Sequence, residues 1–184
     1  MGNCGFSTSD SNKAIYLDDN TSNVVASGNQ AYGTSQYCLQ IHGGSHNTIT
    51  NNVCDITSME KLGFYQDSSY QTHNAAGNVI SHMIVYSAGA SPSTMWDFIW
   101  TNTGTAFNLP SLLDNQYYLV GGPGFSSYAS QTSNGTSFTD ASPNVGNPLF
   151  VAPGSNNYAL QGGSPALSPP VSFVPLLTGQ GPGI

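Results

Sequence analysis

Three aspartates are the residues of this sequence best suited to acid–base chemistry. Asp18 and Asp19 end the segment AIYLDD at 14–19, and Asp67 lies near the end of LGFYQDS at 62–68. Hydrolysis of a glycosidic bond requires two carboxyl groups, about 5–5.5 Å apart when the anomeric configuration is retained and about 6.5–9.5 Å apart when it is inverted. We therefore predict that Asp18, Asp19 and Asp67 are catalytic residues that act as acid, base or nucleophile.

Polar and aromatic residues on the neighbouring segments are candidates for binding a sugar. Hydrogen-bonding side chains pair with sugar hydroxyls, and outward aromatic rings stack on sugar rings. The predicted substrate-binding residues are Gln40, His42, Tyr65, Gln66, Trp96 and Asp97. Structural explanations remain open. Asp18 and Asp19 could be a turn pair, since aspartate bonds its own backbone in turns, and His42, before Gly43, could be a turn residue.

No metal site or cofactor is predicted from the cysteine and histidine pattern. Cys4, Cys38 and Cys54 form no CxxC motif, and three cysteines allow at most one disulfide within the chain. The histidines stand at no spacing typical of a metal site.

The charge composition excludes two classes of partner. Only 6% of the residues are charged, with two lysines, no arginine and a net charge of −7. Such a chain cannot neutralise a phosphate backbone, so we expect no nucleic acid partner. An acidic surface is repelled by anionic membranes, and no apolar stretch reaches the ~20 residues that span a bilayer.

Two series of short segments recur along the chain and must position these side chains. Aligning VASGNQAY (25–32), TITNNVCD (48–55), VISHMIVY (79–86) and LLDNQYY (112–118) brings Asn29, Asn52, Met83 and Asn115 to one position, in steps of 23, 31 and 32 residues. A second, out-of-phase series is AIYLDD, CLQIHGG (38–44), LGFYQDS and MWDFIW (95–100). Strand repeats of this length indicate a solenoid in which each coil buries its apolar side chains on its neighbours.

The repeat predicts an all-β fold, a right-handed parallel β-helix with an irregular C-terminal cap. Asparagine at a turn tolerates left-handed backbone angles and can hydrogen-bond to the asparagine stacked on it, so Asn29 and Asn52 are expected to be structural. At a strand spacing of about 4.8 Å, Asp19 and Asp67 would stand two coils, about 9–10 Å, apart.

The expected domain organisation has four parts. Residues 1–12 are an N-terminal loop or an artificial boundary, 13–120 are the β-helix coils, 121–170 are the final coil and C-terminal ending, and 171–184 are a Pro/Gly-rich tail. An open first coil would favour self-association or an upstream domain.

Two stretches carry a resemblance to a known family. AIYLDDNTSNVVASGNQAY with LQIHGGSHNTITNNV resembles the repeats of bacterial β-helix glycosidases, and NPLFV with NNYALQGGSPAL resembles their C-terminal ending. Over roughly residues 13–167 the chain is similar to the right-handed parallel β-helix proteins of the pectate-lyase-like superfamily. The resemblance implies the C-terminal portion of a carbohydrate-active protein that is secreted or displayed on the cell surface, with a polysaccharide or oligosaccharide as partner.

Three functions remain open from the sequence. The first is polysaccharide hydrolysis of the glycoside hydrolase type, by this chain or by a larger protein of which it is a fragment. The second is a non-catalytic glycan-binding or structural module, such as an adhesin or a tailspike-like part. The third is a polysaccharide lyase, for which a chain without arginine is poorly equipped, because lyases abstract a proton and neutralise a uronate carboxylate.

Overall fold

The described part of the chain is built almost entirely of strands and turns. The computed structural model describes residues 13–34, 36–57, 61–66, 75–89, 95–100, 108–120, 130–133 and 136–175. The described helices are the short 3-10 helices η2 (Pro153–Ser155) and η3 (Pro165–Leu167). No described helix is long and apolar enough to cross a membrane.

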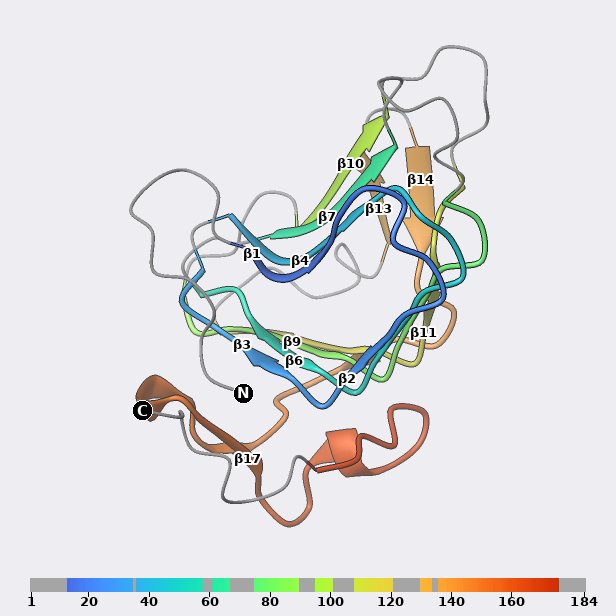
Figure 1. Cartoon of the computed structure of the whole chain (residues 1–184). Coiled ribbons are helices and arrows are strands. Elements are labelled where there is room, and N and C mark those ends of the chain that lie inside the picture. Colours follow the sequence, from blue (N-terminus) through green and yellow to red (C-terminus); the bar gives the residue numbers. More distant parts are fainter. Residues whose placement is uncertain are drawn as a thin grey trace.

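Three parallel sheets contain most of the strands (Figure 1). The first sheet has the order β1 (Lys13–Leu17), β4 (Tyr37–His42), β7 (Lys61–Gln66) and β10 (Trp96–Trp100). The second has the order β2 (Val25–Ser27), β5 (Thr48–Thr50), β8 (Val79–Ser81) and β11 (Ser111–Leu113). The third has the order β3 (Gln30–Ala31), β6 (Val53–Asp55), β9 (Ile84–Ser87), β12 (Gln116–Leu119) and β15 (Asn144–Val145).

Two further sheets are antiparallel hairpins. One pairs β13 (Ser130–Ser133) with β14 (Thr136–Thr139), and the other pairs β16 (Phe150–Ala152) with β17 (Asn157–Leu160). Both lie in the C-terminal part of the chain, after the last strands of the first and second sheets.

The prediction of a right-handed parallel β-helix is wrong. The sheets are separate, with two to five strands each, and no closed β-helix or solenoid is evident in the described part of the chain. Two of these sheets are antiparallel hairpins, which a parallel coil does not contain. Apolar alternation predicts that equivalent segments pair in parallel, but closure into one coil depends on the connections, whose geometry alternation does not encode.

One apolar core lies between the three parallel sheets. In β4, Leu39 and Ile41 point into it and are almost fully buried, whereas Gln40 between them belongs to the opposite face by strand alternation. Ile49 and Ile80 enter the same core from the second sheet, and the third sheet contributes Cys54, Val85 and Tyr117. The Cys38–Cys54 disulfide crosses this core from β4 to β6.

Asparagines stack where the second sheet leads into the third. Asn52 Oδ1 accepts hydrogen bonds from the backbone N–H and the Nδ2 of Asn29, both at 2.9 Å, and Asn115 Oδ1 accepts the N–H of Met83 at 2.9 Å. The left-handed residue is the one before each of these positions, namely Gly28, Asn51, His82 and Asp114. The predicted structural role is therefore filled by hydrogen bonding, while the left-handed angle falls one residue earlier.

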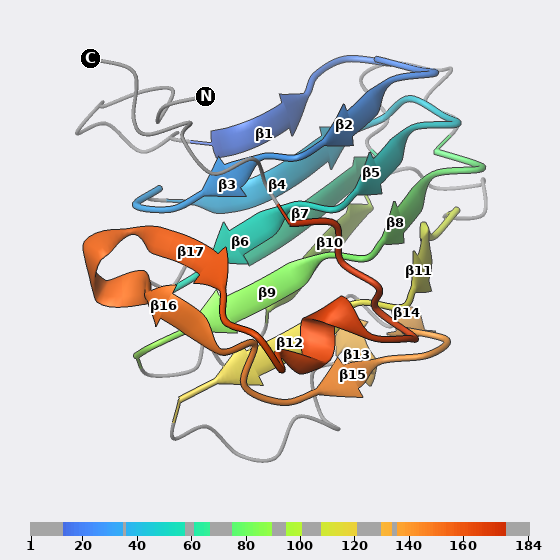
Figure 2. The same ribbon diagram turned by 90° about the horizontal axis from the view of Figure 1, so that it is seen from below.

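The C-terminal segment does not cap the end of the sheets as predicted. It runs back over the outer face of the third sheet, where β16 and β17 lie across β6 and β9 (Figure 2). Val53, Ile84 and Tyr86 form a second apolar cluster there with Phe150 and Tyr158. These large side chains on the outer face need cover from water, which the returning segment supplies.

Candidate active site

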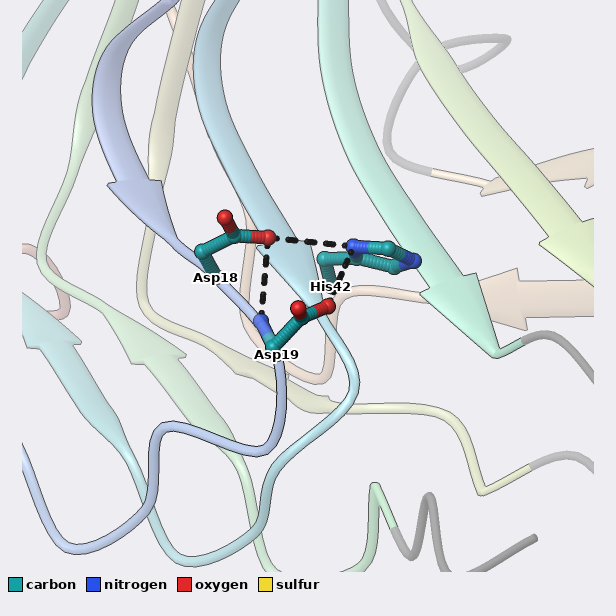
Figure 3. Close-up of side chains that lie close together, drawn as sticks. All are labelled: Asp18, Asp19 and His42. Carbon is teal, nitrogen blue, oxygen red and sulfur yellow. Dashed lines mark hydrogen bonds and ion pairs between the residues drawn. The ribbon is translucent and has the colours of Figure 1, made fainter. Parts of the chain in front are cut away.

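The candidate site lies where β1 and β4 end, at one edge of the first sheet (Figure 3). The two strands pair in parallel, with Leu17 opposite Ile41. The carboxyl ends of parallel strands meet at the same edge of a sheet, so Asp18 and Asp19 after β1 come beside His42 at the end of β4. We refer to Tyr16, Asp18, Asp19 and His42 as the Asp–His cluster.

His42 is the centre of the Asp–His cluster. Its Nδ1 lies 3.2 Å from Oδ1 of Asp18 and 3.3 Å from Oδ1 of Asp19. The hydroxyl of Tyr16 is 3.4 Å from the same nitrogen. Because oxygen acceptors surround Nδ1, this nitrogen carries the proton and donates toward the carboxylates.

Asp18 receives more donors than Asp19. The Tyr16 hydroxyl donates to its Oδ1 at 2.5 Å, the backbone N–H of Asp19 donates at 3.0 Å, and His42 approaches the same oxygen. The Tyr16 hydrogen bond is the main cause of a lowered pKa of Asp18, and His42 and the Asp19 N–H add to it. Asp18 is consequently ionised at neutral pH.

The turn after β1 explains how both carboxylates reach the same histidine. The Thr21 N–H donates to the Asp18 carbonyl at 3.1 Å, and Asp19 and Asn20 have left-handed backbone angles. The side chains of Asp18 and Asp19 are 56% and 48% exposed, against 18% for His42. The two aspartates thus form a turn and still present their carboxylates to solvent beside an imidazole.

Gln40, predicted to bind substrate, is buried in the structure. It lies opposite Tyr16 in the β1–β4 pairing, yet it is only 4% exposed. Its Oε1 is buried without a hydrogen-bond partner among the described residues. In this structure the buried amide of Gln40 cannot contact a polysaccharide in solvent. Gln40 belongs to β4, the strand that ends at His42.

The other predicted site residues are placed only in part. Asp67 lies outside the described residues. Pairing of β4 with β7 puts the backbone of Tyr65 opposite His42, and pairing of β7 with β10 puts Gln66 opposite Trp100 and Asp97 opposite Gly63. Trp96 pairs with Leu62 at the start of β10. The structure therefore brings Asp18, Asp19 and His42 together, with Tyr65 on the adjoining strand, and sets Trp96 and Asp97 one strand further away.

Sequence reasoning missed Tyr16 and Lys13. The Lys13 ammonium lies 4.2 Å from the centre of the Tyr16 ring, and the Tyr16 hydroxyl contacts Asp18. For Tyr16 the available signal was alternation along β1, because Tyr16 and Asp18 are two apart and such residues point to the same face of a strand. Alternation gives no such signal for Lys13, which is three residues from Tyr16.

Asp18, Asp19 and His42 have ligand atoms that all lie within 4.8 Å of one another. Carboxylate and imidazole are both known metal ligands. In this structure the three groups contact one another, and the expectation that the protein uses no metal stays a prediction.

Comparison with protein-family models, with curated proteins and with solved structures finds no match to this chain. The resemblance to the pectate-lyase-like superfamily therefore gains no support from these comparisons.

Proposed function

We propose that this chain is a carbohydrate-active protein that hydrolyses glycosidic bonds of a polysaccharide at the Asp–His cluster. One observation carries the proposal: two solvent-exposed carboxylates lie beside one imidazole with ligand atoms within 4.8 Å of one another. Both carboxylates therefore lie at one point of the surface, close enough to act on the same bond of a bound sugar.

The two carboxylates differ in their surroundings, which supports separate roles. Asp18, with three donors at Oδ1, stays ionised and acts as base or nucleophile. Asp19 has only the His42 contact among its side-chain interactions in the described part of the chain, and acts as the acid. A glycosidase needs one carboxyl group as acid and one as base or nucleophile, and the two aspartates of the cluster would divide these roles.

His42 holds the pair. Its Nδ1 contacts Oδ1 of both aspartates, so one imidazole nitrogen orients both carboxylates. His42 ends β4, whose backbone pairs with β1 on one side and with β7 on the other.

The charge and the disulfide support a polysaccharide partner outside the cytoplasm. A net charge of −7 disfavours nucleic acids and anionic surfaces, whereas a neutral sugar polymer is not repelled. Disulfides persist mainly in oxidising compartments, so the Cys38–Cys54 bond supports a secreted or cell-surface location.

The test is release of reducing ends from a panel of neutral and acidic polysaccharides by the purified chain and by Asp18→Asn and Asp19→Asn. We expect each variant to lose activity by at least about 10²-fold, the usual size of an acid–base contribution. Asp114→Asn is the matched control, because Asp114 also occupies a left-handed turn position but lies at another turn, after β11. Unchanged cleavage by both site variants would overturn the proposal.

A non-catalytic glycan-binding module is the second candidate. The convergence of three donors on one Asp18 oxygen favours it, since a carboxylate so fully engaged is a weak nucleophile but a rigid hydrogen-bond acceptor. Calorimetric binding of a polysaccharide without any release of reducing ends would select this alternative.

A further inference from the structure

Tyr16 occupies a position that the proposed chemistry does not yet explain. Its hydroxyl donates to Oδ1 of Asp18 at 2.5 Å and lies 3.4 Å from Nδ1 of His42. The residue is 37% exposed, so it is not needed to fill the core. It thus links the two groups that the proposed reaction depends on.

We propose that Tyr16 is a positioning residue that holds the Asp18 carboxylate against His42, and that Lys13 holds the Tyr16 ring in place. The proposal rests on the hydrolytic function assigned above to the Asp–His cluster. Tyr16 acts through Asp18, and no contact of Tyr16 with substrate is required.

The geometry restricts Asp18 from two sides. Asp18 is highly exposed and lies just beyond the end of β1, so its carboxylate would otherwise sample several rotamers. The Asp19 N–H fixes one side of Oδ1, and the Tyr16 hydroxyl fixes the other. With both contacts the oxygen faces Nδ1 of His42 and the second carboxylate of the pair.

Lys13 gives the tyrosine a fixed orientation. Its ammonium lies 4.2 Å from the centre of the Tyr16 ring, within the range of a cation–π contact. A cation over the ring also draws electron density from the phenol, which strengthens the hydroxyl as a donor.

The charged and titratable groups that face Asp18 among the described residues come from β1, the turn after it and β4. They are Tyr16, Asp19 and His42, with Lys13 behind the Tyr16 ring. Loss of the Tyr16 hydroxyl therefore leaves Asp18 Oδ1 in contact with His42 and with the backbone N–H of Asp19, and it alters no charged group.

The experiment compares Tyr16→Phe and Lys13→Met with Tyr32→Phe, a partly buried tyrosine outside the cluster. On a polysaccharide that the unaltered chain cleaves, we expect Tyr16→Phe to lower kcat roughly tenfold at nearly constant KM, as misplacement of a reacting group does. The acid limb of the kcat/KM profile should move to higher pH. Lys13→Met should change kcat and the acid limb in the same directions but by less. Tyr32→Phe should leave kcat and the acid limb unchanged.

A second measurement does not depend on activity. NMR titration of the Asp18 carboxyl carbon and the His42 ring should show that Asp18 protonates at higher pH in Tyr16→Phe, with an unchanged thermal unfolding midpoint. Failure to cleave any polysaccharide, together with this NMR shift, would overturn the hydrolytic function and leave the positioning of Asp18 supported. Unchanged titration and kcat in Tyr16→Phe would overturn the role of Tyr16 itself.

Discussion

Oδ1 of Asp18 makes most of the polar contacts of the Asp–His cluster. It accepts from a phenol hydroxyl, a backbone N–H and an imidazole, whereas Asp19 next to it has one such contact. Two identical side chains, adjacent in sequence, therefore have different hydrogen-bond partners. In the proposed hydrolysis this difference in partners underlies the different roles given to Asp18 and Asp19.

The lowered pKa of Asp18 predicts how activity depends on pH. A carboxylate with a depressed pKa stays ionised until the pH falls below its ordinary value, here 3.8, so a base or nucleophile at Asp18 remains competent in mild acid. We expect the acid limb of kcat/KM to lie below pH 3.8. Initial rates between pH 2.5 and 7 measure it, and a limb above pH 5 would contradict the assignment of Asp18.

Folding stability should depend only weakly on Asp18. The pH dependence of stability has the same direction as that of activity. A lowered pKa in the folded state stabilises the protein at pH values above the pKa of the unfolded state, and this contribution is lost as the pH falls through the pKa of the folded state. The carboxylate is more than half exposed, however, and solvent screens its interactions. Activity therefore reports the titration of Asp18 better than unfolding does.

At the scale of elements, short strands are held in register by asparagines at the turns. Asn52 is fully buried and accepts two hydrogen bonds from Asn29, while its Nδ2 donates to the carbonyls of Ala26 and Thr50 at 2.9 Å. A second stack does the same before β2, β5 and β8, where Asn47 accepts from the Val24 N–H and Asn78 from the Asn47 N–H. Strands of two or three residues have too few ladder bonds of their own to set the register alone.

Replacing Asn52 tests this contribution. Asn52→Ala leaves the Asn29 N–H without its acceptor and empties a buried site, which we expect to cost about 2–3 kcal/mol of unfolding free energy. Urea denaturation followed by circular dichroism measures it. Asn29→Ala is the matched control at the end of the stack and should cost about 1 kcal/mol or less. Equal losses in the two variants would argue against a stacked contribution.

The whole molecule is held together by contacts between distant parts of the chain. Val174 exchanges two hydrogen bonds with Asn51 across 123 residues, and the Tyr158 hydroxyl donates to buried Asp55 at 2.6 Å. The C-terminal segment is therefore part of the fold of the third sheet. It shields the outer face of that sheet from water.

Three tyrosines predict the alkaline limit of stability. Burial raises the pKa of Tyr158, Tyr117 and Tyr86 above 10.0, and a nearby aspartate adds to each shift. The unfolded chain releases these protons at lower pH than the folded one, so their contribution is complete below pH 10 and is lost above it. We expect cooperative unfolding above about pH 10, with tyrosinate absorbance of these residues appearing together with the loss of far-ultraviolet circular dichroism. Tyr158→Phe should make unfolding less steeply dependent on pH.

The Cys38–Cys54 disulfide predicts a large loss on removal. It closes a segment with a sequence separation of 16 and lies in the core, where both cysteines are fully buried. A crosslink of this size contributes about 3 kcal/mol in the chain-entropy model. Thermal unfolding of the double variant Cys38→Ala, Cys54→Ala should show this loss. A stable double variant would show that apolar packing suffices.

Several features follow from the sequence alone because they depend on near neighbours. Apolar alternation at 14–17, 38–42 and 62–66 predicts β1, β4 and β7, and the recurrence of Asn29, Asn52 and Asn115 predicts positions that the structure places in one stack. The placing of Asp18, Asp19 and His42 at strand ends is likewise local. Side-chain type and period encode such features directly.

Only the tertiary structure decided which of these pieces meet. The separation of the sheets, the return of the C-terminal segment to Asn51 and the choice of Cys54 as partner of Cys38 all join residues far apart in sequence. So does the meeting of Asp18 with His42, and with it the difference between Asp18 and Asp19. A repeating pattern says that equivalent strands pair, but the path of the connections determines which side chains share one site. For that reason the sequence shows which residues are able to take part in acid–base chemistry. It does not show how they are arranged into a site.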